Sequence, residues 1–210
     1  MTTYNTHQVG ERLTDAGCLL KTREVGLAIR PTVALLNHSC CPNTVRCSAG
    51  DQVVIVASAT IHPGTEVADI YSQCYYEQDR EARQVKCAEY RFTCQCPACE
   101  DNWPLADQLP GAIQDTPSSH LQPGVDRRML PQLARELAAL ERQAKEHWNN
   151  ENIEQSLEYW CQMCAMAEKI FKNPSKLLIV VRKSIQLCLW RLHGYSALTS
   201  SDKDDNSLRG

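Results

Sequence analysis

The chain has 210 residues, enough for one domain or one and a half with a substantial hydrophobic core. Its formal net charge of -3 argues against a large phosphate-binding surface, because non-specific nucleic-acid binding depends on clustered Lys and Arg side chains. The N-terminus shows no apolar leader, and the longest aliphatic run, LLIVV, is far too short to cross a bilayer. We therefore expect a soluble, intracellular protein with no membrane span and no direct nucleic-acid ligand.

Strands are predicted for the first part of the chain. Residues 26–30 and 53–57 are short, β-branched apolar pieces, and Gly50 and Asp51 suit a hairpin turn before the second piece. Residues 31–36 indicate a short helix, because they begin with a proline, which fits the first helical turn. This half of the chain is expected to be mostly β.

Twelve cysteines in a reducing compartment are expected to be thiols or metal ligands rather than disulfides. The stretch FTCQCPACE contains three of them, Cys94, Cys96 and Cys99, and thiolates with this spacing on a tight loop can converge on one tetrahedral zinc ion. Either water fills the fourth position, as in a catalytic site, or a distant cysteine closes a structural site. The alternative is that these thiols are small buried hydrophobes, but the polar neighbours Gln95 and Glu100 favour a zinc loop.

Residues 103–126 are predicted to be a linker, because four prolines and two glycines lie there among polar residues. Residues 127–193 show apolar residues at helical spacing in three runs. The three apolar faces are Leu130, Leu133, Leu137, Leu140 and Ala144; Ile153, Leu157, Trp160, Cys164 and Phe171; and Leu177, Val181, Ile185, Cys188 and Leu192. Such helices suggest an all-α helical-hairpin region of the tetratricopeptide type. Residues 194–210 are polar and are expected to form a disordered tail.

Cys161 and Cys164 share the spacing of metal ligands but lie in the second helical run, among large apolar residues. Core packing is therefore the favoured interpretation for both, and for Cys188 in the third run.

Four motifs, in order, carry a resemblance to a known family. They are NHSCCPN at 37–43, ATIHPGTEV at 59–67, DIY at 69–71 and YRFTCQCPAC at 90–99. Together they resemble the SET and MYND domain family of protein-lysine methyltransferases, and most closely a branch that also carries a helical C-terminal region. The resemblance implies an α+β fold. Its parts are the mostly-β C-terminal half of a SET domain over residues 1–88, a post-SET zinc-binding segment over 89–102, and the helical region beyond.

The resemblance also implies a cofactor, S-adenosylmethionine. In this family the Asn-His pair, here Asn37 and His38, binds the cofactor through the asparagine amide and the histidine backbone. Phe92 corresponds to the aromatic residue that packs over the adenine, and Asn5 resembles an upstream asparagine near the cofactor. Cys40 corresponds to the family's fourth zinc ligand, which closes the site formed by the three thiols of the later loop.

Tyr71 and Tyr90 correspond to tyrosines that line the channel between methyl donor and substrate lysine, so the resemblance implies catalytic roles for both. Aromatic and oxygen-bearing surfaces suit this reaction, because the methyl group leaves a sulfonium cation and the amine must shed water and a proton. Taken alone, a tyrosine after a strand is better explained by core packing, and an Asn-His pair by a cap or turn. The ordered motifs favour a protein-lysine N-methyltransferase.

The family further implies a protein substrate with a target lysine, chromatin-associated or deacetylase partners, and a location in both nucleus and cytoplasm. Its enzymes carry a glycine-rich cofactor segment and a cysteine-rich MYND module upstream, and neither pattern occurs in this sequence. The alternative is therefore a truncated, non-catalytic interaction protein stabilised by zinc. A weaker alternative is a redox or zinc-buffering protein built on exposed thiols.

Overall fold

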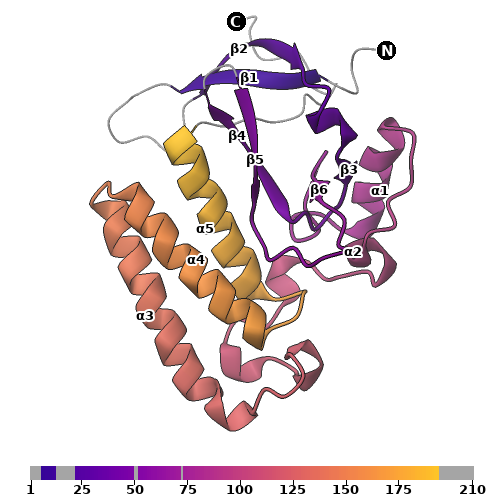
Figure 1. The fold of residues 1–210 in the computed structure, drawn as a ribbon. Helices are drawn as coiled ribbons and strands as arrows, with labels where there is room; N and C mark the ends of the chain where they lie inside the picture. Colours follow the sequence, from indigo (N-terminus) through magenta and orange to yellow (C-terminus); the bar gives the residue numbers. More distant parts are fainter. Residues whose placement is uncertain (1–5, 13–21, 50–51, 72, 194–210) are drawn as a thin grey trace, which may run out of the picture.

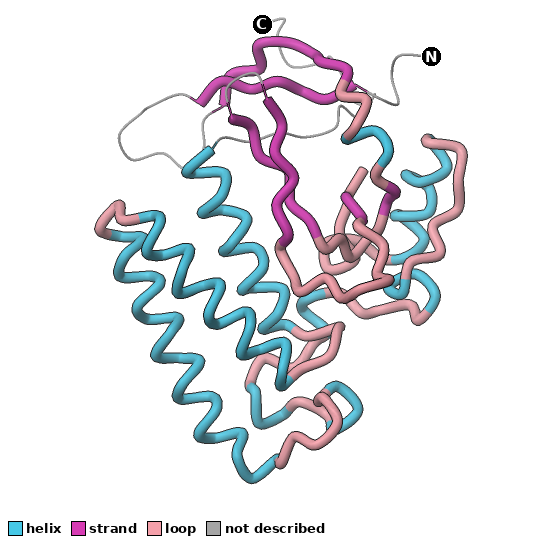
Figure 2. Tube along the Cα trace, viewed as in Figure 1, coloured by secondary structure: helices cyan, strands magenta, loops and turns pink. Residues whose placement is uncertain are grey.

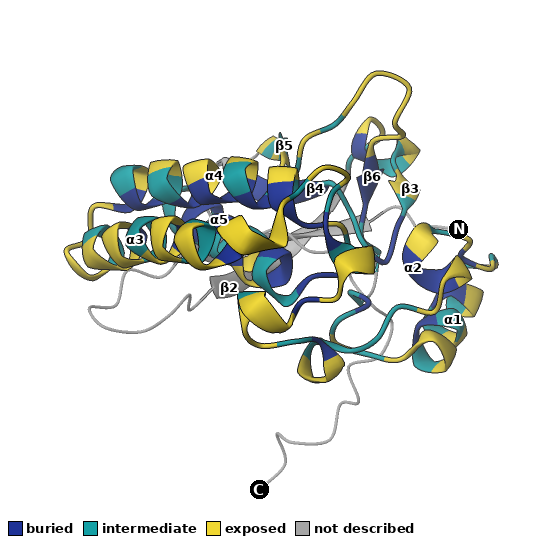
Figure 3. Ribbon diagram, turned by 90° about the horizontal axis from the view of Figure 1, so that it is seen from below, coloured by how far each residue is buried: buried dark blue, intermediate teal, exposed yellow. Residues whose placement is uncertain are grey.

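The computed structural model describes residues 6–12, 22–49, 52–71 and 73–193. Three long helices lie on one side of a β-hairpin, and a group of shorter helices and strands lies on the other side (Figures 1 and 3). The arrangement confirms the expected α+β class with a helical C-terminal part.

The described residues contain three two-stranded sheets. Their strands are β1 (Thr6–Arg12), β2 (Thr22–Ile29), β3 (Asn37–His38), β4 (Thr44–Ala49), β5 (Gln52–Ala57) and β6 (Ala68–Asp69). β1 and β2 pair antiparallel, as do β4 and β5, whereas β3 and β6 run parallel. Strands are thus confirmed where residues 26–30 and 53–57 predicted them, while the Gly50–Asp51 turn lies outside the described residues. The short helix expected over 31–36 is a 3-10 turn at Val33–Leu35.

Two short helices frame the cysteine loop, α1 (Arg80–Glu89) and α2 (Pro97–Glu100). α1 begins after Asp79, whose carboxylate accepts a hydrogen bond from the Ala82 N–H at 2.8 Å and so caps the helix. Pro97 opens α2, because its fixed φ angle fits the first helical turn.

The segment between the cysteine loop and the long helices consists of loops and short 3-10 turns. These turns are Ala106–Gln108, Ile113–Asp115, Ser118–His120 and Arg127–Met129. Leu109 and Leu121 of this segment are buried, and Leu121 forms an isolated β-bridge with Phe171. The segment therefore contributes to the core of the molecule.

The three expected long helices are confirmed as α3 (Leu130–Asn149), α4 (Ile153–Ile170) and α5 (Lys176–His193), with α4 packed between the other two (Figure 2). None of the described helices is both long and apolar enough to pass through a membrane.

Two of the helical cysteines, Cys164 and Cys188, are buried as expected, whereas Cys161 is exposed. The core-packing prediction for Cys161 is therefore wrong. Its position explains the error, because it follows the buried Trp160 by one residue and is turned by about 100° around the helix axis.

A continuous buried core joins the helices to the hairpin. Val45 and Cys47 of β4 belong to the same cluster as the apolar faces of α3, α4 and α5. The Trp190 indole N–H of α5 donates to the Arg46 carbonyl of β4 at 2.9 Å. A second, smaller core holds the buried cysteines of the loop together with Ile179 of α5. The helices thus contact both the hairpin and the cysteine loop.

Candidate metal centre and adjoining aromatic cluster

Four cysteine sulfurs meet next to β3. Cys40 follows β3, Cys94 and Cys96 lie in the loop after α1, and Cys99 lies in α2. The four sulfur atoms lie within 4.8 Å of one another, and Cys40 Sγ is 3.6 Å from Cys99 Sγ and 3.9 Å from Cys94 Sγ. A tetrahedral zinc ion with Zn–S bonds of about 2.3 Å separates its sulfur ligands by about 3.8 Å. This sulfur cluster therefore has the spacing of a four-cysteine zinc site.

Backbone and amide hydrogen bonds hold the sulfur-bearing residues. The Gln84 side chain accepts from the Cys94 N–H at 3.0 Å and donates to the Cys94 carbonyl at 2.8 Å. The Cys96 carbonyl accepts from the Cys99 N–H at 2.8 Å, which closes the turn between these two thiols. Because these hydrogen bonds hold the cysteines in place, the site is largely preformed for a metal ion.

A buried guanidinium faces the sulfur cluster. Arg83 of α1 is fully buried and donates to the carbonyl oxygens of Tyr75, Gln78 and Ala98 and, at 3.7 Å, to Cys99 Sγ. A buried positive charge is costly unless negative charge lies nearby. Among these partners only the cysteine sulfur can carry negative charge, and the thiolate is the form that binds zinc. The position of Arg83 therefore favours a thiolate metal site.

The sulfur atoms differ in their affinity for protons. Hydrogen bonds from the thiols of Cys40 and Cys87 hold the pKa of Cys94 far below its usual range. The pKa of Cys40 is raised, chiefly by its hydrogen bonds with Cys87 and Cys94. Within this hydrogen-bonded group the Cys94 thiol therefore loses its proton more readily than the Cys40 thiol.

Sequence reasoning missed three residues of α1 that support this site, namely Arg83, Gln84 and Cys87. Cys87 is buried, and its sulfur lies within 4.8 Å of ligand atoms of His38 and Cys94. The available signal was the spacing of Arg83 and Cys87, four residues apart on one helix face directly before the cysteine loop. Spacing alone cannot tell whether such a face is buried or exposed.

An aromatic cluster of His38, Tyr71, Tyr90 and Phe92 borders the sulfur cluster. The ring centres of Tyr71 and Tyr90 are 5.5 Å apart, those of Tyr71 and Phe92 6.1 Å, and those of His38 and Phe92 5.6 Å. The Tyr71 hydroxyl donates to the Leu36 carbonyl, and the Tyr90 hydroxyl donates to the Tyr71 carbonyl at 3.4 Å. Burial raises the pKa of both tyrosines, so both remain neutral phenols at neutral pH. The structure thus brings these four predicted side chains together.

Asn37 lies at the exposed edge of the aromatic cluster. The parallel pairing of β3 with β6 sets His38 opposite Asp69, and Asn37 precedes it on the same short strand. The Asn37 amide donates to the Glu66 carboxylate at 2.6 Å. Its side chain is therefore accessible from solvent and lies beside a negative charge. Asn5, the other predicted cofactor residue, lies outside the described residues.

A buried ion pair fixes the backbone that leads into Tyr71. Arg46 Nε of β4 lies 2.8 Å from Asp69 Oδ2 of β6, and both side chains are at most 5% exposed. Arg46 also donates to the Ile70 carbonyl at 2.8 Å. Because these contacts fasten β6 to the hairpin, the position of Tyr71 depends on β4.

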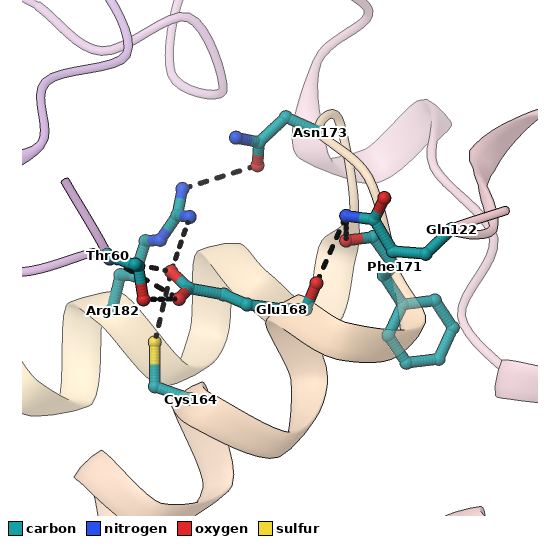
Figure 4. Close-up of polar contacts among 7 residues, drawn as sticks. All are labelled: Thr60, Gln122, Cys164, Glu168, Phe171, Asn173 and Arg182. Atoms are coloured by element: carbon teal, nitrogen blue, oxygen red, sulfur yellow. Dashed lines mark hydrogen bonds and ion pairs between the residues drawn. The ribbon is translucent and has the colours of Figure 1, made fainter. Parts of the chain in front are cut away.

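A second ion pair connects the helices to the site (Figure 4). Glu168 of α4 accepts hydrogen bonds from the backbone and hydroxyl of Thr60, and Arg182 of α5 lies 3.0 Å from the same carboxylate. Arg182 also donates to the Asn173 side chain at 3.2 Å. Burial raises the pKa of Cys41 to about 11, and its contact with Arg182 opposes that shift. The positive charge of Arg182 therefore acts on the residue next to Cys40 of the sulfur cluster.

Comparison with known proteins adds an independent observation. Residues 6–72 match the SET domain family. N-lysine methyltransferase SMYD2 of Bos taurus is 43% identical over 76 residues, which are 36% of this chain and 17% of that protein. Histone-lysine N-methyltransferase SMYD3 is 26% identical over 161 residues in both Homo sapiens and Mus musculus, which are 77% of this chain and 32% of either protein. The chain thus spans a third or less of the length of these relatives.

The matched residues run from β1 to β6 and include Asn37, His38, Cys40 and Tyr71. Over these residues the chain is therefore similar to the SET domain family and to the SMYD lysine methyltransferases.

Proposed function

We propose that this chain forms part of a protein-lysine N-methyltransferase, which transfers a methyl group from S-adenosylmethionine to a lysine of a protein substrate. The proposal rests on one observation, namely that residues 37–40 contribute side chains to both the aromatic cluster and the sulfur cluster. Asn37 and His38 border the aromatic cluster, whereas Cys40 belongs to the sulfur cluster. A single short segment thus joins the proposed cofactor residues to the proposed zinc ligands.

In this proposal Asn37, His38 and Phe92 bind S-adenosylmethionine, and so does Asn5. The cofactor supplies an electrophilic methyl group on a sulfonium cation. The residues present suit such a ligand, because aromatic ring faces and the nearby Glu66 carboxylate favour positive charge.

Tyr71 and Tyr90 are assigned to the lysine side of the reaction. As neutral phenols they offer a hydroxyl and an aromatic face, which orient an amine and exclude water around it. A desolvating pocket lowers the pKa of an ammonium group, so the lysine loses its proton before the amine attacks. Alignment and desolvation are therefore the contributions assigned to the protein.

The sulfur cluster is assigned to a structural zinc ion, held by Cys94, Cys96 and Cys99 of the proposed post-SET segment and by Cys40 of the SET part. Four sulfur donors at tetrahedral spacing leave no open coordination position, which is typical of structural rather than catalytic zinc.

The proposal also covers the branch of the family, the role of the three long helices and the partners of the whole protein. The string GLAIRPTVALLNHSCCPNTVR supports the branch of SET and MYND domain-containing protein 4. We assign α3, α4 and α5 to a helical region of the tetratricopeptide type, supported by their consecutive packing. Such a region offers a docking surface for the protein substrate and for chromatin-associated or deacetylase partners in nucleus and cytoplasm.

The direct test is transfer of a labelled methyl group by the purified, zinc-loaded 210-residue chain to core histones and a panel of lysine-rich proteins. We expect transfer that falls about 100-fold or more in Tyr71→Phe, because the hydroxyl oxygen that orients the amine in the transition state is lost. Tyr159→Phe is the matched control, since Tyr159 lies on α4 beside His147. Equal rates in wild type and Tyr71→Phe contradict the role of Tyr71. A folded, zinc-containing chain that transfers no methyl group favours the zinc-stabilised interaction protein.

A further inference from the structure

The imidazole of His38 lies between the sulfur cluster and the backbone of Tyr71. Its Nδ1 atom is 3.0 Å from the Tyr71 backbone nitrogen, and its Nε2 atom is 3.3 Å from Cys40 Sγ. The ring is half-buried and packs against the rings of Tyr71 and Phe92, with centres 5.3 Å and 5.6 Å away. Both ring nitrogens therefore have a specific partner, one on each side.

The partner of Nδ1 fixes the tautomer of the ring. A backbone N–H is always a donor, so Nδ1 must accept the hydrogen bond from Tyr71 and carries no proton. In a neutral imidazole the proton then resides on Nε2, which faces Cys40 Sγ. His38 is thus a hydrogen-bond donor to the sulfur cluster.

The same argument removes a competing interpretation. Ligand atoms of His38, Cys87 and Cys94 also lie within 4.8 Å of one another, a spacing compatible with a metal ion. A protonated Nε2 has no lone pair for a metal, and Nδ1 is occupied by Tyr71. The geometry therefore favours a supporting role for His38 over a ligand role.

We propose that His38 is a positioning residue that couples the metal centre to Tyr71. Its Nε2–H group stabilises the Cys40 thiolate and slows release of the metal, while its Nδ1 atom fixes the backbone that carries the Tyr71 phenol. The importance of this coupling for methyl transfer rests on the proposed function. The coupling itself concerns only the zinc-loaded chain.

Two substitutions of His38 each remove one of its two hydrogen bonds and keep the other. The amide oxygen of His38→Asn can replace Nδ1, so this variant keeps the acceptor for the Tyr71 N–H and loses the donor to Cys40. The amide nitrogen of His38→Gln can replace Nε2–H, so this variant keeps the donor to Cys40 and loses the acceptor for Tyr71. His62→Asn, on an exposed turn, is the control for a histidine outside the site.

The readouts are zinc release to a chromophoric chelator and hydrogen exchange of the Tyr71 backbone amide, both on the full chain. We expect zinc release about 10- to 100-fold faster in His38→Asn and near wild type in His38→Gln, because supporting partners of ligands tune metal affinity by such factors. We expect faster amide exchange at Tyr71 in His38→Gln and wild-type protection in His38→Asn. His62→Asn should leave both readouts unchanged.

Equal changes of zinc release and amide exchange in both variants would indicate a general loss of structure and overturn the proposal. An unchanged rate of zinc release in His38→Asn would also overturn it. Nitrogen NMR of the wild-type imidazole provides a test that needs no variant. It should show the proton on Nε2, and a proton on Nδ1 contradicts the coupling. If the readouts separate in a chain that transfers no methyl group, the coupling holds and the enzymatic assignment fails.

Discussion

Cys40 and Cys41 are adjacent in the sequence, but only Cys40 has its sulfur in the sulfur cluster. Serine cannot replace a soft thiolate as a zinc ligand. We therefore expect Cys40→Ser to lose stoichiometric zinc during dialysis against a mild chelator, and Cys41→Ser to retain it, as measured by elemental analysis. Equal zinc contents in the two variants would show that the four-cysteine site is assigned wrongly.

At the residue scale, the sequence predicted which side chains gather but not what supports them. The spacing of Cys94, Cys96 and Cys99 is local, so their convergence was visible directly, whereas Cys40 and Tyr71 were added only by the resemblance to the SET and MYND domain family. Arg83 remained unnoticed, because its contact with the sulfur cluster depends on how α1 packs against α2.

The contact between helices α4, α5 and the loop after β5 depends on one ion pair. Arg182 and Glu168 are less than one-fifth exposed, and removing one partner leaves the other buried without its opposite charge. We expect Arg182→Met to lower the free energy of unfolding by about 3 kcal/mol, measured by urea denaturation. Lys145→Met, which removes an exposed ion pair on α3, should cost less than about 1 kcal/mol. Similar losses in the two variants would contradict this account.

The same ion pair predicts a dependence of stability on pH. Burial raises the pKa of Glu168, but hydrogen bonds from Thr60 and the ion pair with Arg182 outweigh it, so the pKa lies below its ordinary value of 4.5. A carboxylate with a lowered pKa stabilises the fold above its unfolded pKa, and this contribution is lost as the pH falls through the folded pKa. We expect wild type to exceed Glu168→Gln in unfolding free energy at neutral pH, and the difference to shrink as the pH falls below the ordinary pKa of about 4.5. A difference that is constant with pH would exclude this contribution.

At the element scale, long periodic segments were predictable and short pairings were not. The apolar faces of α3, α4 and α5 follow the helical period over many residues, so the helices were visible from the sequence. The parallel pair β3 and β6 has two residues per strand, and it depends on contacts between residues distant in the sequence, such as those of Ser39 with Asp69 and of His38 with Tyr71. No local pattern encodes such a pairing.

At the scale of the whole molecule, the helices and the cysteine loop share packed residues. Ile179 of α5 belongs to the core around the buried cysteines, and Val45 of β4 belongs to the core of the helices. We therefore expect zinc release and loss of helical circular dichroism to occur at the same urea concentration, because neither part keeps its core without the other. Zinc retained after the helices have melted would show that the two parts fold independently.

The central claim is that residues 37–40 join a cofactor pocket to a metal centre, and cofactor binding tests it most directly. The measurement is a calorimetric titration of the purified, zinc-loaded chain with S-adenosylmethionine and with its demethylated product. The account predicts saturable binding that is abolished by Asn37→Ala and unaffected by Asn149→Ala, a substitution at an exposed position of α3. No binding by a folded, zinc-containing chain would contradict the account, and binding that survives Asn37→Ala would move the cofactor away from this segment.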